Sequence, residues 1–114
     1  MTLLPKVVSR ESGVEERFVL ELAPDLLVFQ GHFPDNPILP GVVQLDWAVR
    51  LGREAFGPLG EFQGINHLKF MNLIRPGERI ELFLSFDSGN GKLGFRYEGE
   101  AGRKSTGVIL FRQP

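Results

Sequence analysis

The fold is decided by residues 42–56, which read VVQLDWAVRLGREAF. The apolar side chains of this stretch surround almost the whole circumference of a helix, and Arg50, Arg53 and Glu54 come only late in it. This pattern is typical of a buried helix. One sheet face cannot cover such a helix on every side, so either the sheet curls around it or a second subunit closes the far side. We expect a dimer.

The residues after Gly57 and Pro58 follow a period of two, which predicts β-strands over residues 62–74, 79–87, 93–99 and 105–112. Short, glycine-rich connections at 75–78, 88–92 and 99–103 predict antiparallel neighbours joined as hairpins. Before the helix, residues 17–22 and 26–29 each predict a strand or strand end. Together these elements predict a single α+β domain over residues 1–114, with a curved antiparallel sheet around one central helix.

Composition narrows the possible functions. Thirteen Lys and Arg residues against fourteen Asp and Glu residues give a net charge of -1, so we expect neither nucleic acid nor a membrane as partner. The chain has no cysteine and only two histidines, which argues against a metal site and leaves histidine, carboxylates and backbone for any chemistry. No metal and no other cofactor is expected. Without a signal-peptide pattern or a long apolar run, the expected location is the cytoplasm.

An ordered loop precedes the helix, because prolines at positions 34, 37 and 40 hold the backbone extended and stiff. Loop and helix share the pattern His32-Phe33-Pro34-x-x-Pro37-x-x-Pro40-Gly41-Val42-x-x-x-Asp46. This pattern resembles the hot-dog β-hydroxyacyl-acyl carrier protein dehydratases, with looser similarity at residues 68–70 and 75–77. Residues 40–48 are most similar to a subgroup found in aryl polyene or related lipid pathways.

Dehydration of a β-hydroxyacyl thioester needs a base for the α-proton, an acid for the departing hydroxyl, and donors for the carbonyl oxygen. His32 is suited to be the base, since its ordinary pKa lies near neutrality. Asp46, set between Leu45 and Trp47, is the expected acid, because apolar neighbours favour a neutral carboxyl. The resemblance implies the same two roles for these residues.

The backbone supplies the expected carbonyl donors. Gly41 opens the helix, so its N–H and that of Val42 lie at the positive end of the helix dipole, where a thioester oxygen would bind. The resemblance implies the same use of this glycine. Phe33 and Trp47 are the candidate walls of an acyl tunnel, although aromatic residues of a small α+β domain belong to the core more often, and Phe33 is the stronger of the two candidates.

The resemblance also implies a substrate carried as a thioester on acyl carrier protein or coenzyme A. In the family the histidine of one subunit faces the carboxylate of its partner, so the expected homodimer shares its active sites. One departure from the family is Asp35, where many members have glycine; its charge would raise the pKa of His32.

Other interpretations stay open. Asp46 and Arg50 are four residues apart and would form an ordinary helical ion pair, although the apolar neighbours argue against it. Gly41 would serve equally well as a plain helix cap. At the level of the whole protein, the alternatives are a hot-dog thioesterase and a catalytically silent acyl-binding subunit of a heterodimer.

Overall fold

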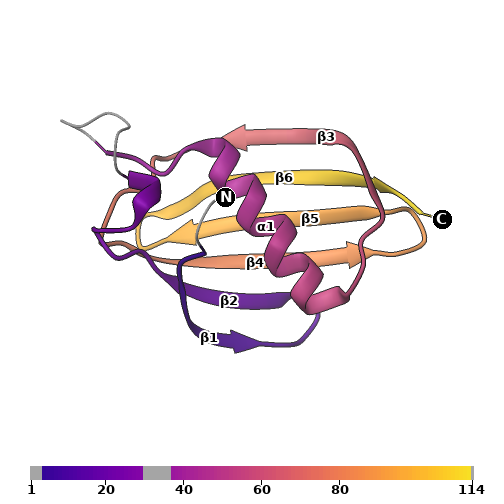
Figure 1. The fold of residues 1–114 in the computed structure, drawn as a ribbon, viewed down its shortest axis with the longest axis horizontal. Coiled ribbons are helices and arrows are strands. Elements are labelled where there is room, and N and C mark those ends of the chain that lie inside the picture. Colours follow the sequence, from indigo (N-terminus) through magenta and orange to yellow (C-terminus); the bar gives the residue numbers. More distant parts are fainter. Residues whose placement is uncertain (1–3, 30–36, 114) are drawn as a thin grey trace.

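The computed structural model describes residues 4–29 and 37–113. Within these two ranges, six strands form one sheet, and every neighbouring pair is antiparallel. In chain order the elements are β1 (Lys6–Glu11), β2 (Glu16–Glu21), the 3-10 helix η1 (Leu27–Phe29), α1 (Gly41–Phe56), β3 (Glu61–Phe70), β4 (Arg79–Asp87), β5 (Lys92–Gly99) and β6 (Gly102–Arg112). The strand order is β1-β2-β4-β5-β6-β3, and α1 runs diagonally across one face (Figure 1).

The inner face of the sheet is made by alternate residues of the central strands. In β4, Ile80, Leu82 and Leu84 are fully buried, whereas the residues between them are not. The helix adds Trp47, Ala48 and Leu51, each with no exposed surface. Period-two alternation in the strands and a helical stripe on α1 therefore meet in one apolar core.

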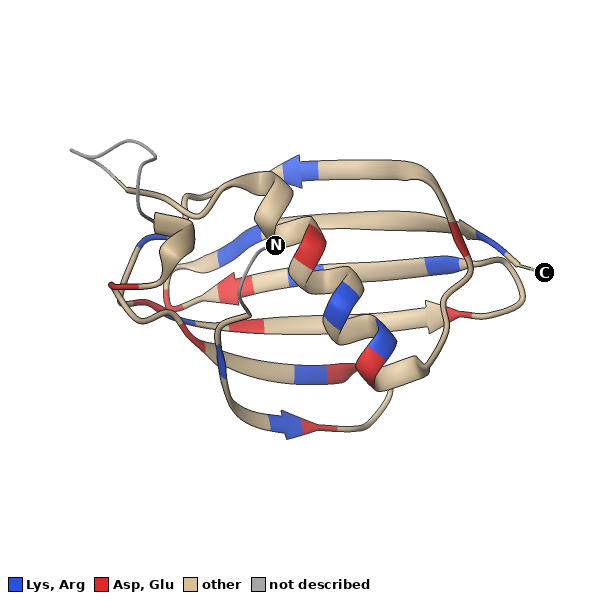
Figure 2. Ribbon diagram, viewed as in Figure 1, with Lys and Arg blue, Asp and Glu red and all other residues tan. Residues whose placement is uncertain are grey.

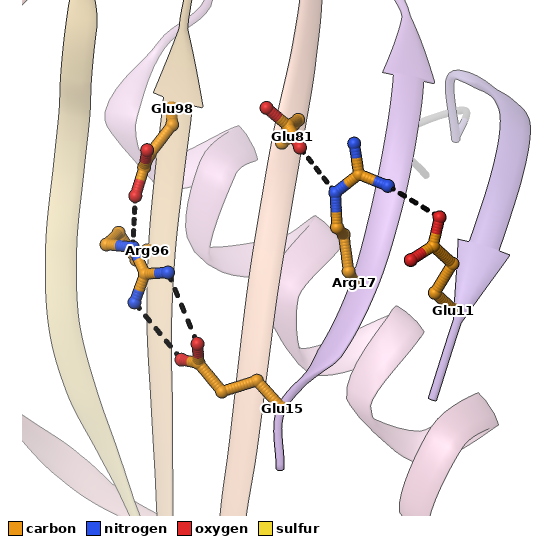
Figure 3. A network of polar contacts seen from close by, with 6 residues as sticks. All are labelled: Glu11, Glu15, Arg17, Glu81, Arg96 and Glu98. Carbon is orange, nitrogen blue, oxygen red and sulfur yellow. Dashed lines mark hydrogen bonds and ion pairs between the residues drawn. The ribbon is translucent and has the colours of Figure 1, made fainter. Parts of the chain in front are cut away.

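The outer face of the same strands is charged (Figure 3). Arg96 of β5 pairs with Glu98 and with Glu15, the latter at 3.1 Å. Arg17 of β2 pairs in the same way with Glu81 and with Glu11. One face of the sheet is therefore charged and exposed to water, and the other face packs against the helix.

The predicted α+β architecture is confirmed, and several elements fall where the sequence places them. The helix begins at Gly41 and ends at Phe56. The connections after β4 and after β5 are hairpins, because β4 pairs with β5 and β5 with β6.

Two local predictions are wrong. Residues 27–29 form a 3-10 turn, because the Phe29 N–H donates to the Leu26 carbonyl three residues back. The connection after β3 is not a hairpin, since β3 pairs with β6 and β4 pairs with β2. Residues 71–74 leave the strand, and buried Ile74 packs in the core, so the connection is long enough to cross from the sheet edge to β4.

Strand β3 is one edge of the sheet and carries several large exposed apolar side chains. Phe62 is 57% exposed and Phe70 51%, with Leu68 also exposed. His67, in the same strand, is exposed and has a positive φ of 55°, where the pairing with β6 is interrupted by a bulge. Within the described ranges, no helix has both the length and the apolar character needed to cross a membrane.

Candidate active site

The first turn of α1 presents free backbone donors. Pro40 caps the helix in an extended conformation without a side-chain hydrogen bond, and its carbonyl accepts from the N–H groups of Val43 and Gln44 at 3.1 and 3.2 Å. Among the described residues, the N–H groups of Gly41 and Val42 have no hydrogen-bond partner. They lie at the positive end of the helix dipole and can therefore receive an oxygen atom that carries negative charge.

A pocket of about 250 Å³ opens beside this turn. One wall is the start of the helix with the residues before it, and the other is the chain that leaves β3. Its lining residues are Ile38, Leu39, Gly41, Gln44, Phe70, Met71, Asn72 and Leu73. The lining is mainly apolar, as a site for an acyl chain requires.

Hydrogen bonds hold the two walls at a set distance from each other. The N–H of Leu39 donates to the Ile74 carbonyl at 2.8 Å, which joins one wall to the other. On the far wall, the Asn72 amide donates to the Arg103 carbonyl at 2.7 Å. Lys104, almost fully buried, donates to the Leu73 carbonyl at 3.0 Å and pairs with Glu78. The pocket is thus preformed in a single chain.

Phe70 lies directly against Gly41. A Cβ atom added to Gly41 would stand 2.6 Å from the tip of the Phe70 ring, closer than real contacts allow. An alanine at this position would force the half-exposed Phe70 ring to shift. The predicted approach of a substrate to the backbone also favours glycine here.

Asp46 does not have the apolar surroundings expected from its neighbours in sequence. Its carboxylate is 42% exposed and lies 3.6 Å from the Arg50 guanidinium, one helical turn away. The expectation that this ion pair would not form is wrong. The reason is helical geometry: Trp47 turns into the core with no exposed surface, whereas residues four apart share one face. Acidic and basic residues follow one another along the α1 ribbon (Figure 2).

Tyr97 lies under the first turn of the helix and is completely buried. Its hydroxyl donates to the Gln44 carbonyl at 2.6 Å. Burial raises the pKa of Tyr97 well above its ordinary value, and the negative charge of Asp46 raises it further. The phenol therefore stays neutral and acts as a donor to the helix.

The other predicted site residues have different positions. Gly41 lines the pocket, and Val42 is 72% exposed at the surface. Trp47 belongs to the core and not to the pocket lining, so its part in a tunnel stays a prediction. His32 and Phe33 lie outside the described residues. Within the described ranges, no three His, Asp or Glu side chains are grouped as metal ligands.

Gln44, Ser105 and Lys104 were not among the predicted site residues. Gln44 carries a signal that could have found it, because it is an uncharged polar residue on the buried stripe of an otherwise apolar helix. Nothing in the strand pattern distinguishes Ser105 or Lys104 before the pairing of β6 is known.

Comparison with known proteins assigns the chain to a family. Residues 9–108 match the ApeI-like family, described as ApeI dehydratase. The chain belongs to this dehydratase family. The family resemblance predicted from the motif is thereby confirmed.

Two curated relatives of the ApeI-like chain have the same name. A 3-hydroxyacyl-(acyl-carrier-protein) dehydratase FabZ of Caldanaerobacter subterraneus subsp. tengcongensis is 33% identical over 93 residues, 75% of this chain and 66% of the relative. The enzyme of the same name from Latilactobacillus sakei is 32% identical over 82% of this chain and 72% of its own length. The chain thus spans about two thirds of the length of these relatives.

Solved structures extend the similarity across almost the whole chain. The dehydratase heterocomplex ApeI:P from Xenorhabdus doucetiae contains a chain with 34% identity and a TM-score of 0.87, with 95% of this chain and 97% of that chain covered. An uncharacterized protein from Erwinia carotovora subsp. atroseptica has 32% identity and a TM-score of 0.80, with 95% of each chain covered. The dehydratase domain of PpsC from Mycobacterium tuberculosis, at 18% identity and a TM-score of 0.72, shares the fold.

Proposed function

We propose that this ApeI-like chain removes water from a β-hydroxyacyl thioester and yields the trans-2-enoyl thioester. The observation that carries the proposal is the pocket at the start of α1, where the N–H groups of Gly41 and Val42 have no partner among the described residues and lie beside an apolar lining. A thioester carbonyl bound there would gain stabilisation as negative charge develops on its oxygen.

The proposed reaction uses His32 and Asp46 in complementary roles. His32 takes the proton from the α-carbon, the C–O bond at the β-carbon breaks, and Asp46 gives its proton to the departing hydroxyl, which leaves as water. Proton donation needs a neutral carboxyl, whereas Asp46 pairs with Arg50 in the isolated chain. We therefore propose that the acid becomes competent when a partner subunit covers this face of α1 and desolvates the carboxylate.

A second copy of the chain is the proposed partner. Strand β3 offers an unpaired edge, and its exposed Phe62, Leu68 and Phe70 form an apolar margin beside it. Exposed strand edges with apolar side chains favour pairing with another chain. In the resulting homodimer, His32 of one copy would meet Asp46 of the other.

Acyl carrier protein is the proposed carrier of the substrate. Lys69 and Arg75 are exposed and lie on either side of the pocket-lining segment 70–73. Exposed basic side chains that flank a pocket-lining segment along the chain favour an acidic carrier protein. The cytoplasm is the proposed location.

The test is to incubate the purified protein with a panel of β-hydroxyacyl thioesters on acyl carrier protein and to follow the conjugated enoyl product. We expect enoyl product with the native chain and none with His32→Ala. Free carrier thiol without enoyl product would indicate a thioesterase instead.

One observation favours a second candidate, a subunit that works only beside a different chain. A structure with 34% identity to this chain is described as a heterocomplex. If the native chain binds acyl carrier protein without turnover and gains activity only with a second, different subunit, the heterodimer replaces the homodimer.

A further inference from the structure

A buried polar cluster lies beneath the first turn of α1 and consists of Gln44, Ser105 and Tyr97. Gln44 is 3% exposed, and the other two have no exposed surface. Each of the three hydrogen bonds of the cluster joins a different part of the fold. The Ser105 hydroxyl donates to the Gln44 side-chain oxygen at 2.7 Å, the Gln44 side-chain nitrogen donates to the Leu39 carbonyl at 3.2 Å, and the Tyr97 hydroxyl donates to the Gln44 carbonyl at 2.6 Å.

This position does not need a polar side chain for packing. The helix neighbours Val43, Trp47 and Ala48 are apolar and buried, and a methionine would fill a similar volume at Gln44 without polar atoms. Burying an amide is unfavourable unless its donors and acceptors are paired. Every buried side-chain nitrogen and oxygen in the described part of the chain is in fact paired. A fully paired buried network fixes one geometry where apolar contacts tolerate several.

The geometry that the cluster fixes is that of Leu39. Its carbonyl accepts from Gln44, and its N–H donates to Ile74 across the pocket. Only Pro40, with its restricted φ, separates this clamped residue from Gly41. The direction of the Gly41 and Val42 N–H groups therefore depends on where Gln44 holds Leu39.

The cluster also ties the helix to the sheet. Tyr97 of β5 and Ser105 of β6 are directly paired across the two strands, and both bond to the same helical residue. The start of α1 cannot slide over the sheet without breaking both hydrogen bonds. Asp46, two residues after Gln44, moves with the same turn.

We propose that Gln44, Ser105 and Tyr97 are positioning residues for the dehydration, which aim the Gly41 and Val42 N–H groups at the thioester carbonyl. The inference rests on the proposed function. Donors act on the transition state through their placement, and a misplacement of about 1 Å can cost about 100-fold in rate. The cluster should therefore affect kcat more than KM.

The test compares Gln44→Met, Gln44→Glu, Ser105→Ala and Tyr97→Phe in the native protein with acyl carrier protein thioesters. Ile109→Val, a truncation in the same core, controls for lost stability, and Ser85→Ala controls for loss of a hydroxyl on the exposed face of β4. All rates are measured well below each variant's unfolding temperature.

We expect Gln44→Met to lower kcat about 10- to 100-fold with KM changed by less than about threefold. Gln44→Glu keeps the acceptor for Ser105 but loses the donor to Leu39, so kcat should fall nearly as far. Ser105→Ala should add little to Gln44→Met in the double variant, because the two share one hydrogen bond. Ile109→Val and Ser85→Ala should keep native kcat.

The inference is overturned if the cluster variants lose no more kcat than Ile109→Val at equal loss of stability, or if KM rises while kcat stays native. A native protein that makes no enoyl product overturns the proposed function, and the inference with it. Native turnover with unaffected cluster variants overturns the inference alone.

Discussion

The two faces of the sheet use polar groups in opposite ways, although the same strands carry both. On β5, Tyr97 points to the helix and belongs to a fully buried cluster, whereas its neighbours Arg96 and Glu98 lie on the charged outer face (Figure 3). Both sets of side chains are hydrogen-bonded. The two faces differ in their access to water. Water and salt screen the exposed ion pairs, whereas a polar group in the core that loses its partner cannot form a hydrogen bond to water instead. A change on the helix face should therefore have large effects, and a change on the outer face small ones.

The largest expected effect is on turnover at the helix. Asp46→Asn keeps the shape of the side chain but removes the proton that it is proposed to donate, so kcat should fall on the order of 10²- to 10⁴-fold. Stability should change little, because the carboxylate is 42% exposed. Glu98→Gln on the outer face, assayed beside it for enoyl formation, should stay at the native rate. Near-native turnover in Asp46→Asn would contradict the assignment of Asp46 as the acid.

The next effect is on stability at the mouth of the pocket. Gly41→Ala places a methyl group against the Phe70 ring, and the overpacking should lower the free energy of unfolding by about 1–3 kcal/mol. Denaturant unfolding followed by the fluorescence of Trp47, the single tryptophan, measures this directly. The double variant Gly41→Ala with Phe70→Leu should recover part of the loss; no recovery would mean that the ring is not the cause.

A smaller effect is expected at Tyr97, and it depends on pH. Because burial and the charge of Asp46 raise its pKa, the folded chain keeps the phenol proton where the unfolded chain has lost it. The stabilisation linked to this raised pKa is fully present below about pH 10, the ordinary tyrosine pKa, and decreases as the pH rises further.

Tyr97→Phe should lose about 1 kcal/mol with its hydrogen bond at neutral pH and show a flatter decline above about pH 10. Tyr97 is the single tyrosine, so tyrosinate absorbance reports its titration alone. A midpoint at the ordinary value in the folded protein would contradict the burial of this group. Asp46→Asn should lower the midpoint relative to the native chain.

The smallest effect is expected on the outer face. Glu15→Gln weakens the pairing of Glu15 with Arg96, and the loss should be about 0.2–1 kcal/mol, shrinking further at high salt. Urea unfolding at low and high salt provides the measurement. The proposed difference between the two faces would be contradicted if Glu15→Gln lowered the free energy of unfolding as much as Gly41→Ala, or if its effect did not change with salt.

Much of the architecture could be predicted from the sequence because local pattern determines it. The apolar stretch at 42–56 and the alternation in β4, β5 and β6 arise within a few residues and need no distant contact. Strand β1 was missed because all six of its residues are outside the core and show no alternation of burial. The partner of β3 could not be predicted, since an edge strand is defined by its neighbours.

The sequence by itself determined the type of most elements, the family motif and the residues with suitable chemistry: His32, Asp46 and Gly41. Only the tertiary structure decided their surroundings. It turned Asp46 toward Arg50, laid Phe70 against Gly41, and placed Ser105 and Tyr97 under Gln44 from strands about sixty and fifty residues away along the chain. The physical reason is that propensity and periodicity act over a helical turn, whereas burial and hydrogen-bond partners depend on which distant segments pack together.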